Sequence, residues 1–210
     1  MKENKFKLIV KAMMAGCAIS LGGLANIYSQ NNVIGSLFFC IGLFVILVWN
    51  LNLFTGKICF CFTDNQIKLL DLFLVYIGNI IGCVSFGYLM RIISLNTLIE
   101  STVLSLHIKV SNPWFVNIIK GFMCNLCIYI AVIGYRDLNK EVEKILSLIL
   151  GVSVFVLCRF EHCIADVFYI SFCNLWNLTS LVFIMTVTVG NILGGITIPI
   201  IFKFLKRLEK

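Results

Sequence analysis

Three long stretches without a charged residue limit what this chain can fold into. They run from Ala12 to Gly56, from Leu72 to Met90 and from Val167 to Phe202. A helix needs about 20 mostly apolar residues to cross a lipid bilayer, so the first and last stretches are each long enough for more than one crossing. The chain is also only 13% charged, against about 25% in ordinary soluble domains. The sequence therefore predicts an all-α integral membrane protein.

We expect six transmembrane helices in a single transmembrane domain that covers residues 1–210. Their expected bounds are Phe6–Ile27, Ile34–Phe62, Lys68–Ile93, Pro113–Tyr135, Lys144–Phe172 and Leu178–Phe204. Polar turns at 29–32 and 174–180 separate neighbouring helices, and residues 94–112 form a longer, more polar connection. The first span has no small-residue cleavage site, so we interpret it as a permanent helix and not as a signal peptide.

The basic residues predict how the protein is oriented in the membrane. With an even number of helices both termini share one side, and that side carries thirteen Lys and Arg residues. The opposite side carries only Arg91 and Lys109. Because Lys and Arg are enriched in cytoplasmic loops, we expect a multi-pass protein of the plasma membrane with both termini in the cytoplasm. The net charge of +7 follows from this topology and does not indicate nucleic-acid binding.

The two halves of the chain resemble each other. The segment GNIIG begins at Gly78 in the third expected helix, and GNILGG begins at Gly190 in the sixth. Each half, 1–95 and 110–207, contains three helices, so the second half must cross the membrane in the opposite direction to the first. This is an inverted repeat of three plus three helices, a plan found in many transporters and channels. We attribute the glycines themselves to close helix packing.

Polar residues interrupt the second and fifth expected helices at corresponding places. The segment WNLNLFTGK breaks the second helix and CRFEHCIAD breaks the fifth. Non-helical backbone at membrane depth persists only where it faces protein or a water-filled cavity, so paired interruptions point to a permeation site. The N-termini of the resulting half-helices suit an anion. We expect the buried amides of Asn79 and Asn191 to tie neighbouring helices to this broken backbone.

Four motifs, in order along the chain, resemble those of the formate/nitrite transporter family. NLFTG at 52–56 resembles the family's E-L-F-T-G loop, and KGFMCNLCIYIAV at 120–132 resembles R-G-x-x-C-N-x-x-V-x-x-A-V. RFEHCIADVFYI at 159–170 resembles G-F-E-H-S-x-A-N-M-F, and GNIIG and GNILGG match the G-N-x-x-G pairs. The resemblance implies a homopentamer of aquaporin-like protomers, each with its own pore. The implied substrate is a small monovalent weak-acid anion, formate or nitrite first, with a hydrosulfide channel as the alternative within the family.

The resemblance also implies roles for single residues. His162 matches the pore histidine, Thr55 the hydroxyl that faces it, and Lys109 a lysine of the outer vestibule that concentrates anions. Asn125 and Asn191 match buried amides of the pore region. Two hydrophobic constrictions are implied, the cytoplasmic one with Phe39 and Leu43 and the outer one with Leu53, Ile128 and Phe155. The loop framework positions are Asn52, Phe54, Gly56 and Glu161.

The chemistry of these residues fits such a substrate. Apolar rings resist a bare charge, a cationic vestibule attracts an anion, and a histidine titrates near neutral pH. The histidine can therefore lend a proton, so that the species crossing the narrowest ring is closer to the neutral acid. A weak-acid anion fits this arrangement better than chloride does. The expected partners are the anion and the lipid bilayer, with no cofactor, no metal and no nucleic acid.

Three residues depart from the motifs that they otherwise match. Asn52 stands where the family usually has Glu or Asp, Arg159 replaces Gly, and Asp166 replaces Asn. An unpaired charge at this depth is costly. One hypothesis is therefore that Glu161 or Asp166 neutralises Arg159. The other is that Arg159 adds a second cation near the pore and shifts the preference among anions.

Two other functions compete with an anion channel. A water or glycerol channel shares the fold logic, but the chain has no N-P-A loops and its only prolines are Pro113 and Pro199. A membrane enzyme with His162 and Glu161 as acid and base lacks a nucleophile or a metal cluster, so we expect no enzyme activity. The ten cysteines lie mostly within the expected helices, where thiols act as small apolar residues.

Overall fold

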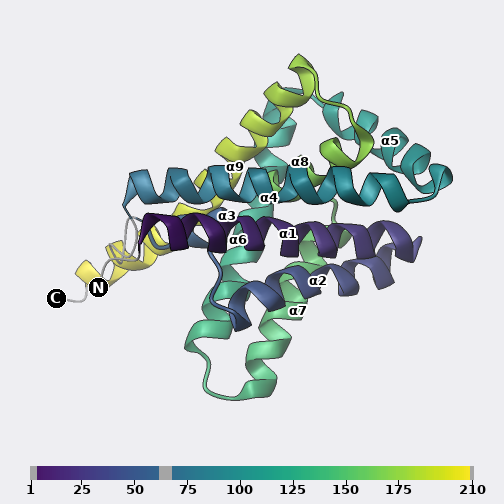
Figure 1. Cartoon of the computed structure of the whole chain (residues 1–210). Coiled ribbons are helices and arrows are strands. Elements are labelled where there is room, and N and C mark those ends of the chain that lie inside the picture. The colour runs from purple at the N-terminus through teal and green to yellow at the C-terminus, as the bar shows by residue number, and fades with distance from the viewer. Residues whose placement is uncertain (1–3, 62–67, 209–210) are drawn as a thin grey trace.

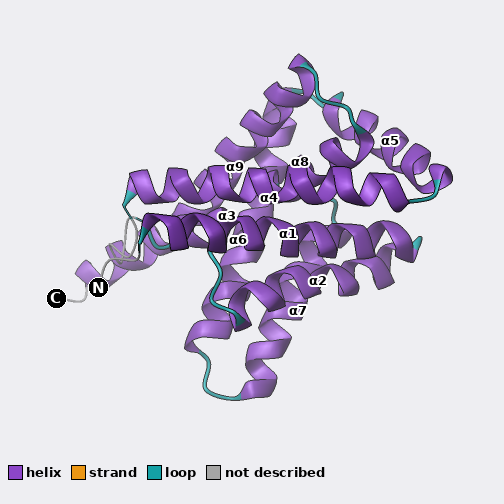
Figure 2. Cartoon of the chain, in the orientation of Figure 1, coloured by secondary structure: helices purple, strands orange, loops and turns teal. Residues whose placement is uncertain are grey.

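The computed structural model describes residues 4–61 and 68–208, and every regular element within them is an α-helix (Figure 2). The helices of these residues are α1 (Lys5–Ser29), α2 (Asn32–Val48), α3 (Phe54–Ile58), α4 (Leu69–Ile93), α5 (Asn96–Val110), α6 (Trp114–Asp137), α7 (Glu141–Leu157), α8 (Cys163–Cys173) and α9 (Leu178–Leu208). Helices α1, α4, α6 and α9 are each long and apolar enough to cross a membrane. The expected end of the second span, Phe62, lies outside the described residues.

Polar residues set the turn between α1 and α2. Gln30 closes α1 in the left-handed conformation, with φ 48°. The side-chain oxygen of Asn31 then accepts hydrogen bonds from the backbone N–H groups of Val33 and Ile34, both at 3.0 Å, and so caps α2. Such caps satisfy donors that have no partner within the helix. The two helices therefore fold back on each other within the polar segment that the sequence predicted as a turn.

Glycines allow two helix pairs to pack backbone against backbone. Helix α1 lies beside α4, and α6 packs against α9 (Figure 1). A side chain at Gly82 would collide with the carbonyl oxygen of Met13, and one at Gly194 would collide with that of Phe122. Gly82 and Gly194 occupy the same place in the two Gly-Asn motifs, so both halves use the same device for close packing.

The chain leaves helical geometry twice at matching positions. Five residues separate the end of α2 at Val48 from the start of α3 at Phe54, and five also separate the end of α7 at Leu157 from the start of α8 at Cys163. In each interruption one residue has a positive φ, Asn50 at 50° and Arg159 at 54°. The residue after each donates its backbone N–H to the carbonyl five residues earlier, at 2.9 Å in both cases. These bonds form the helix-ending motif in which the left-handed position is usually glycine.

The connection between α4 and α6 contains a helix that the sequence analysis did not predict. Helix α5 occupies residues 96–110 of the segment expected to be a polar connection. Its buried residues Leu98, Thr102 and Leu106 recur every four positions and form one face. Figure 1 shows α5 at the end of the molecule opposite to the two termini.

Candidate functional site

A histidine and a threonine from the two interruptions meet at the centre of the molecule. His162 is the last residue before α8, and Thr55 lies in the first turn of α3. The His162 Nε2 atom lies 2.9 Å from the Thr55 hydroxyl oxygen. Both side chains are buried, with relative exposures of 2% and 0%. The structure therefore brings together the two residues that the resemblance paired, although they are far apart in the sequence.

The hydrogen bonds of His162 define which nitrogen carries the proton. Its Nδ1 accepts a hydrogen bond from the backbone N–H of Ala165 at 3.2 Å, so the imidazole serves as the N-cap of α8. A nitrogen that accepts a hydrogen bond carries no proton. The ring is then neutral, with its proton on Nε2, which donates to the Thr55 hydroxyl. Protonation of Nδ1 would cost this helix cap, so the charge of His162 is coupled to the backbone at the break.

Two asparagines hold the interrupted backbone in place with equivalent bonds. The Oδ1 atom of Asn79 accepts from the Phe54 N–H at 2.8 Å, and its Nδ2 donates to two carbonyl oxygens at 2.7 and 2.9 Å. The Oδ1 atom of Asn191 accepts from the Cys163 N–H at 2.9 Å, and its Nδ2 donates at 2.8 and 3.0 Å. Phe54 and Cys163 are the first residues of α3 and α8. Both amides thus make the bonds to broken backbone that the sequence predicted.

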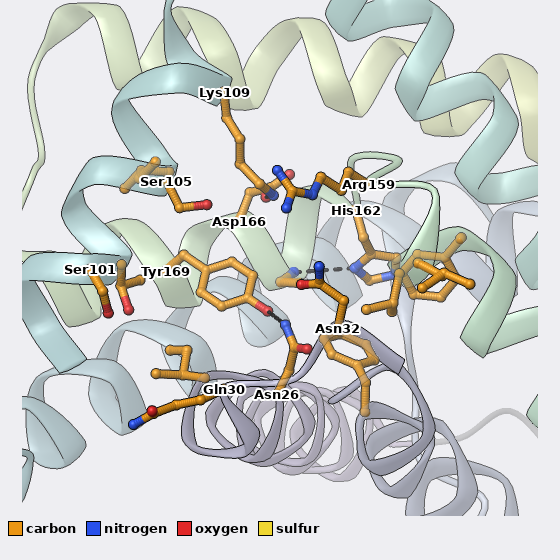
Figure 3. A pocket seen from close by; sticks show the side chains of 18 of the residues that line it. Asn26, Gln30, Asn32, Ser101, Ser105, Lys109, Arg159, His162, Asp166 and Tyr169 are labelled. Atoms are coloured by element: carbon orange, nitrogen blue, oxygen red, sulfur yellow. Dashed lines mark hydrogen bonds and ion pairs between the residues drawn. The ribbon is translucent and has the colours of Figure 1, made fainter. Parts of the chain in front are cut away.

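A pocket opens from His162 toward α5 and is called here the α5-side pocket (Figure 3). It encloses about 320 Å³. It is lined by Asn26, Ile27, Gln30, Asn31, Asn32, Phe39, Ser101, Thr102, Ser105, Leu106, Lys109, Phe155, Val156, Leu157, Arg159, His162, Ala165, Asp166 and Tyr169. Many of the polar side chains come from α5 and the α1–α2 turn, and Phe155 stacks on His162 with ring centroids 5.9 Å apart.

A second pocket, the α3-side pocket, lies at the interruption between α2 and α3 and encloses about 410 Å³. Its lining consists of Leu43, Ile46, Leu47, Asn50, Leu51, Leu53, Gly56, Lys57, Phe60, Val132, Tyr135 and Arg136. Basic and aromatic residues thus occur together with leucines in this pocket, and the loop-framework residue Gly56 is part of its wall.

The two pockets divide the residues of the predicted constrictions, and the constrictions themselves stay a prediction. Phe39 belongs with Phe155, because both line the α5-side pocket and their rings meet edge to face with centroids 5.6 Å apart. Leu43 belongs with Leu53 in the α3-side pocket. Phe39 and Leu43 are one turn apart on α2 and line different pockets. Ile128 is buried and lines neither pocket.

Lys109 lines the α5-side pocket but is held by two carboxylates. Its Nζ lies 2.6 Å from Glu161 Oε2 and 3.1 Å from Asp166 Oδ1. Lys120 adds a further pair, 3.4 Å from Glu161 Oε1. Burial alone would lower the pKa of Lys109, but the charges of Asp166 and Glu161 outweigh it and raise the pKa above its usual range. Lys109 is therefore fully charged, and its charge is balanced where it stands.

The hypothesis that Glu161 or Asp166 neutralises Arg159 is wrong. Among the described residues, both carboxylates pair with lysines, and Arg159 makes no hydrogen bond or ion pair. Its side chain is exposed within the α5-side pocket. The physical reason is that a lysine from α5, a helix that the sequence analysis did not predict, reaches both carboxylates.

The remaining predicted residues form the wall around the centre. Asn125 donates from Nδ2 to the carbonyl oxygens of Thr55, at 3.2 Å, and Asn191, at 2.7 Å, and lines neither pocket. Asn52 donates to the Leu8 carbonyl oxygen at 3.4 Å. The ring of Phe54 packs against that of Tyr76, with centroids 4.7 Å apart. These residues support the site without facing it.

Sequence reasoning missed two contributors to this wall. Lys120 was treated only as part of a motif, although a lysine within an apolar span signals a buried carboxylate partner. The thiol of Cys83 lies 3.3 Å from the carbonyl oxygens of both Gly16 and Ile164, and so ties α4 to α1 and α8. Nothing in the spacing of the cysteines marked Cys83 out from the others.

Comparison with known proteins identifies the class of fold. A solved structure described as a pentameric formate channel with formate bound superposes with a TM-score of 0.82 and 21% identity, over 97% of this chain and 98% of that one. An FNT family ion channel superposes with a TM-score of 0.85 and 20% identity, over 97% and 91% of the two chains. The all-helical fold is therefore the fold of these membrane channels.

Sequence comparison gives the family. The sequence model described as formate/nitrite transporter matches residues 1–205, and this chain belongs to that family. The formate channel FocB of Escherichia coli (strain K12) is 25% identical over 190 residues, which is 81% of this chain and 67% of FocB. The formate channel FocA of Haemophilus influenzae is 24% identical over 197 residues, 80% of this chain and 68% of FocA. The chain is thus a multi-pass membrane protein of a channel family, and these relatives indicate no catalytic function.

Proposed function

We propose that this chain conducts small monovalent weak-acid anions, formate or nitrite first, between the α5-side pocket and the α3-side pocket. The observation that carries the proposal is the buried pair of His162 and Thr55, which lies at the inner end of the α5-side pocket. Membership of the formate/nitrite transporter family and the similarity to two proteins named as formate channels support the same substrate class.

The passage has a thin apolar barrier with proton donors at its centre. Phe39 and Leu43 face different pockets but lie only four residues apart, about 6 Å along the helix. An anion that leaves the α5-side pocket meets the paired rings of Phe39 and Phe155, which resist a bare charge. His162 Nε2–H and the Thr55 hydroxyl offer hydrogen bonds to the anion at that point. A weak-acid anion that takes a proton from water in the pocket, leaving a hydroxide behind, crosses this barrier as the neutral acid, whereas chloride stays charged.

The membrane arrangement belongs to the same proposal. Helices α2 with α3, and α7 with α8, each form one interrupted crossing, which gives six crossings in two inverted halves. The equivalent bonds of Asn79 and Asn191 support this repeat. Both termini lie in the cytoplasm, and the α5-side pocket opens to the outside. The chain assembles as a homopentamer in the plasma membrane, as the pentameric formate channel of similar fold suggests.

Flux into proteoliposomes tests the proposal directly. Formate, nitrite, hydrosulfide and chloride are compared at several pH values for the wild-type protein and for His162→Asn. Asn is a good N-cap, so this variant keeps the backbone bond that His162 makes to Ala165 and removes only the titrating ring. We expect selective flux of a weak-acid anion in the wild type, and loss of its pH dependence in the variant.

The other outcomes separate the competing functions. Hydrosulfide flux that exceeds formate and nitrite flux would assign the hydrosulfide alternative. Liposome swelling in glycerol, with no anion flux, would assign a neutral-solute channel. Absence of flux for all four anions, from protein that is folded and pentameric, would reject the proposal.

A further inference from the structure

We propose that Arg159 is an oxyanion-docking residue of the α5-side pocket, which makes the channel favour planar two-oxygen anions such as formate and nitrite over chloride and hydrosulfide. This inference rests on the proposed function and adds a basis for choosing among anions.

The first argument is the balance of charge around the pocket. Lys109 and Lys120 are matched by Glu161 and Asp166, at distances between 2.6 and 3.4 Å. These four charges cancel. The guanidinium of Arg159 remains, and it has no hydrogen bond or ion pair among the described residues. The field that an incoming anion meets in this pocket therefore comes chiefly from Arg159 and not from the lysine that the resemblance implied.

The second argument is where the guanidinium lies. Arg159 is exposed and lines the α5-side pocket together with His162. In Figure 3 the side chains of Arg159 and Lys109 reach toward the same side of the pocket, near Asp166. An anion bound to Arg159 thus already stands in the cavity that ends at the imidazole. The pocket holds about 320 Å³, ample space for an anion of three non-hydrogen atoms with its remaining water.

The third argument is the backbone conformation. Arg159 has a φ of 54°, a left-handed conformation that costs free energy for any residue with a Cβ atom. The equivalent position in the other interruption is Asn50, at a φ of 50°, and asparagine is among the residues that adopt this conformation most readily. A small polar residue is therefore sufficient for the backbone to adopt this conformation. A long guanidinium side chain here has no structural partner that would explain it, and ligand binding does.

The chemistry of the side chain specifies the ligand. A guanidinium presents parallel N–H donors in a rigid fork that matches two oxygens of one planar anion. Formate and nitrite both offer such a pair of oxygens. Chloride and hydrosulfide offer one centre, so they gain the attraction of the charge but not the second hydrogen bond. A lysine at the same place would attract all four anions alike, because an ammonium acts as a point charge.

The test measures the half-saturation concentration for flux of each anion. Arg159→Gln keeps the side chain without the charge, Arg159→Lys keeps the charge without the fork, and Arg159→Gly relieves the backbone strain. Arg91→Gln is the matched control, because this substitution removes the same charge from α4. Arg91 donates to the Phe172 carbonyl oxygen at 2.9 Å and does not line the pocket. Formate-dependent thermal stabilisation of the solubilised protein measures binding without transport.

We expect Arg159→Gln and Arg159→Gly to raise the half-saturation concentration for formate and nitrite about tenfold, the scale of one charge-assisted hydrogen-bonded pair. Arg159→Lys recovers only part of this loss. The values for chloride and hydrosulfide change less than about threefold, as expected for loss of an exposed charge. Thermal stabilisation by formate falls in parallel, and Arg91→Gln matches the wild type. If Arg159→Gln does not assemble, Arg159→Gly gives the same measurement with a relaxed backbone.

Two results would overturn the docking site. If the half-saturation concentration rose equally for all four anions, Arg159 would attract anions only by its charge. If it were unchanged in all three Arg159 variants, Arg159 would not take part in anion uptake. Failure of the proposed function has a different signature, because the wild-type protein itself would then carry none of the weak-acid anions. In that case the thermal measurement still decides whether formate binds at Arg159.

Discussion

The carboxylate of Asp166 is only half satisfied. Its Oδ1 accepts from Lys109 at 3.1 Å, while the buried Oδ2 has no hydrogen-bond partner among the described residues. A buried polar atom without a partner costs free energy. Lys109 does not depend on Asp166 alone, because Glu161 lies closer, at 2.6 Å. The second carboxylate therefore mainly cancels positive charge at the α5-side pocket.

Removal of this carboxylate should strengthen anion uptake. In Asp166→Asn the pocket gains one unit of net positive charge, and Lys109 keeps Glu161 as its partner. We expect the half-saturation concentration for every transported anion to fall about fivefold, or about 1 kcal/mol, with little loss of thermal stability. Flux into proteoliposomes measures the effect, and added salt should weaken it. Asp71→Asn, the same change in the first turn of α4 and outside the pocket, is the control. An unchanged half-saturation concentration would show that the net charge of the α5-side pocket has no influence on anion uptake.

At the scale of elements, the interrupted helices depend on buried amides. Asn79 satisfies the first N–H of α3 and two further carbonyl groups, all within the buried interior. No water from the solvent replaces such bonds at membrane depth. Asn191 does the same for α8. The two amides thus hold the half-helices at the angle that brings Thr55 to His162.

Loss of one amide should therefore unfold the site before the rest of the protein. We expect Asn79→Ala to destabilise the protein by about 1–3 kcal/mol for each backbone group left unpaired, and to abolish flux. Ser85→Ala is the control, because Ser85 lies exposed on the same helix. Thermal melting in detergent and flux are measured together. A stable Asn79→Ala protein with normal flux would contradict the role of the amide in positioning α3.

The sequence predicted the helices better than the contacts between them. Apolar length set the bounds of α4 and α9 to within a few residues, because lipid thickness dictates helix length. Helix α5 was missed, since its four-residue spacing of Leu98, Thr102 and Leu106 occurs in a polar segment. The partition of Phe39 and Leu43 between two pockets was also missed. Which pocket each residue lines depends on how far along the molecule its helical turn lies. The spacing of residues in the sequence does not give that position.

At the scale of the whole molecule, the two halves share a framework but differ in chemistry. Leu53 and His162 stand at equivalent places before α3 and α8, and Asn52 and Glu161 precede them. The first half therefore contributes apolar and amide groups, and the second contributes the imidazole and the charges. The repeated Gly-Asn motifs predicted the common framework. The ion pairs of Lys109 were not predictable, because they depend on how α5 folds back over α8.

This asymmetry predicts that the two ends of the passage respond differently to reagents. Ser105 lines the α5-side pocket, so a membrane-impermeant maleimide should modify Ser105→Cys when it is added to intact cells and not when it is added to inverted vesicles. Formate should slow the reaction, because an anion bound in the pocket shields the thiol. The unsubstituted chain gives the background from Cys158, which is exposed. Modification only in inverted vesicles would contradict the orientation predicted from the basic residues. Modification that formate does not slow would show that the α5-side pocket is not part of the anion pathway.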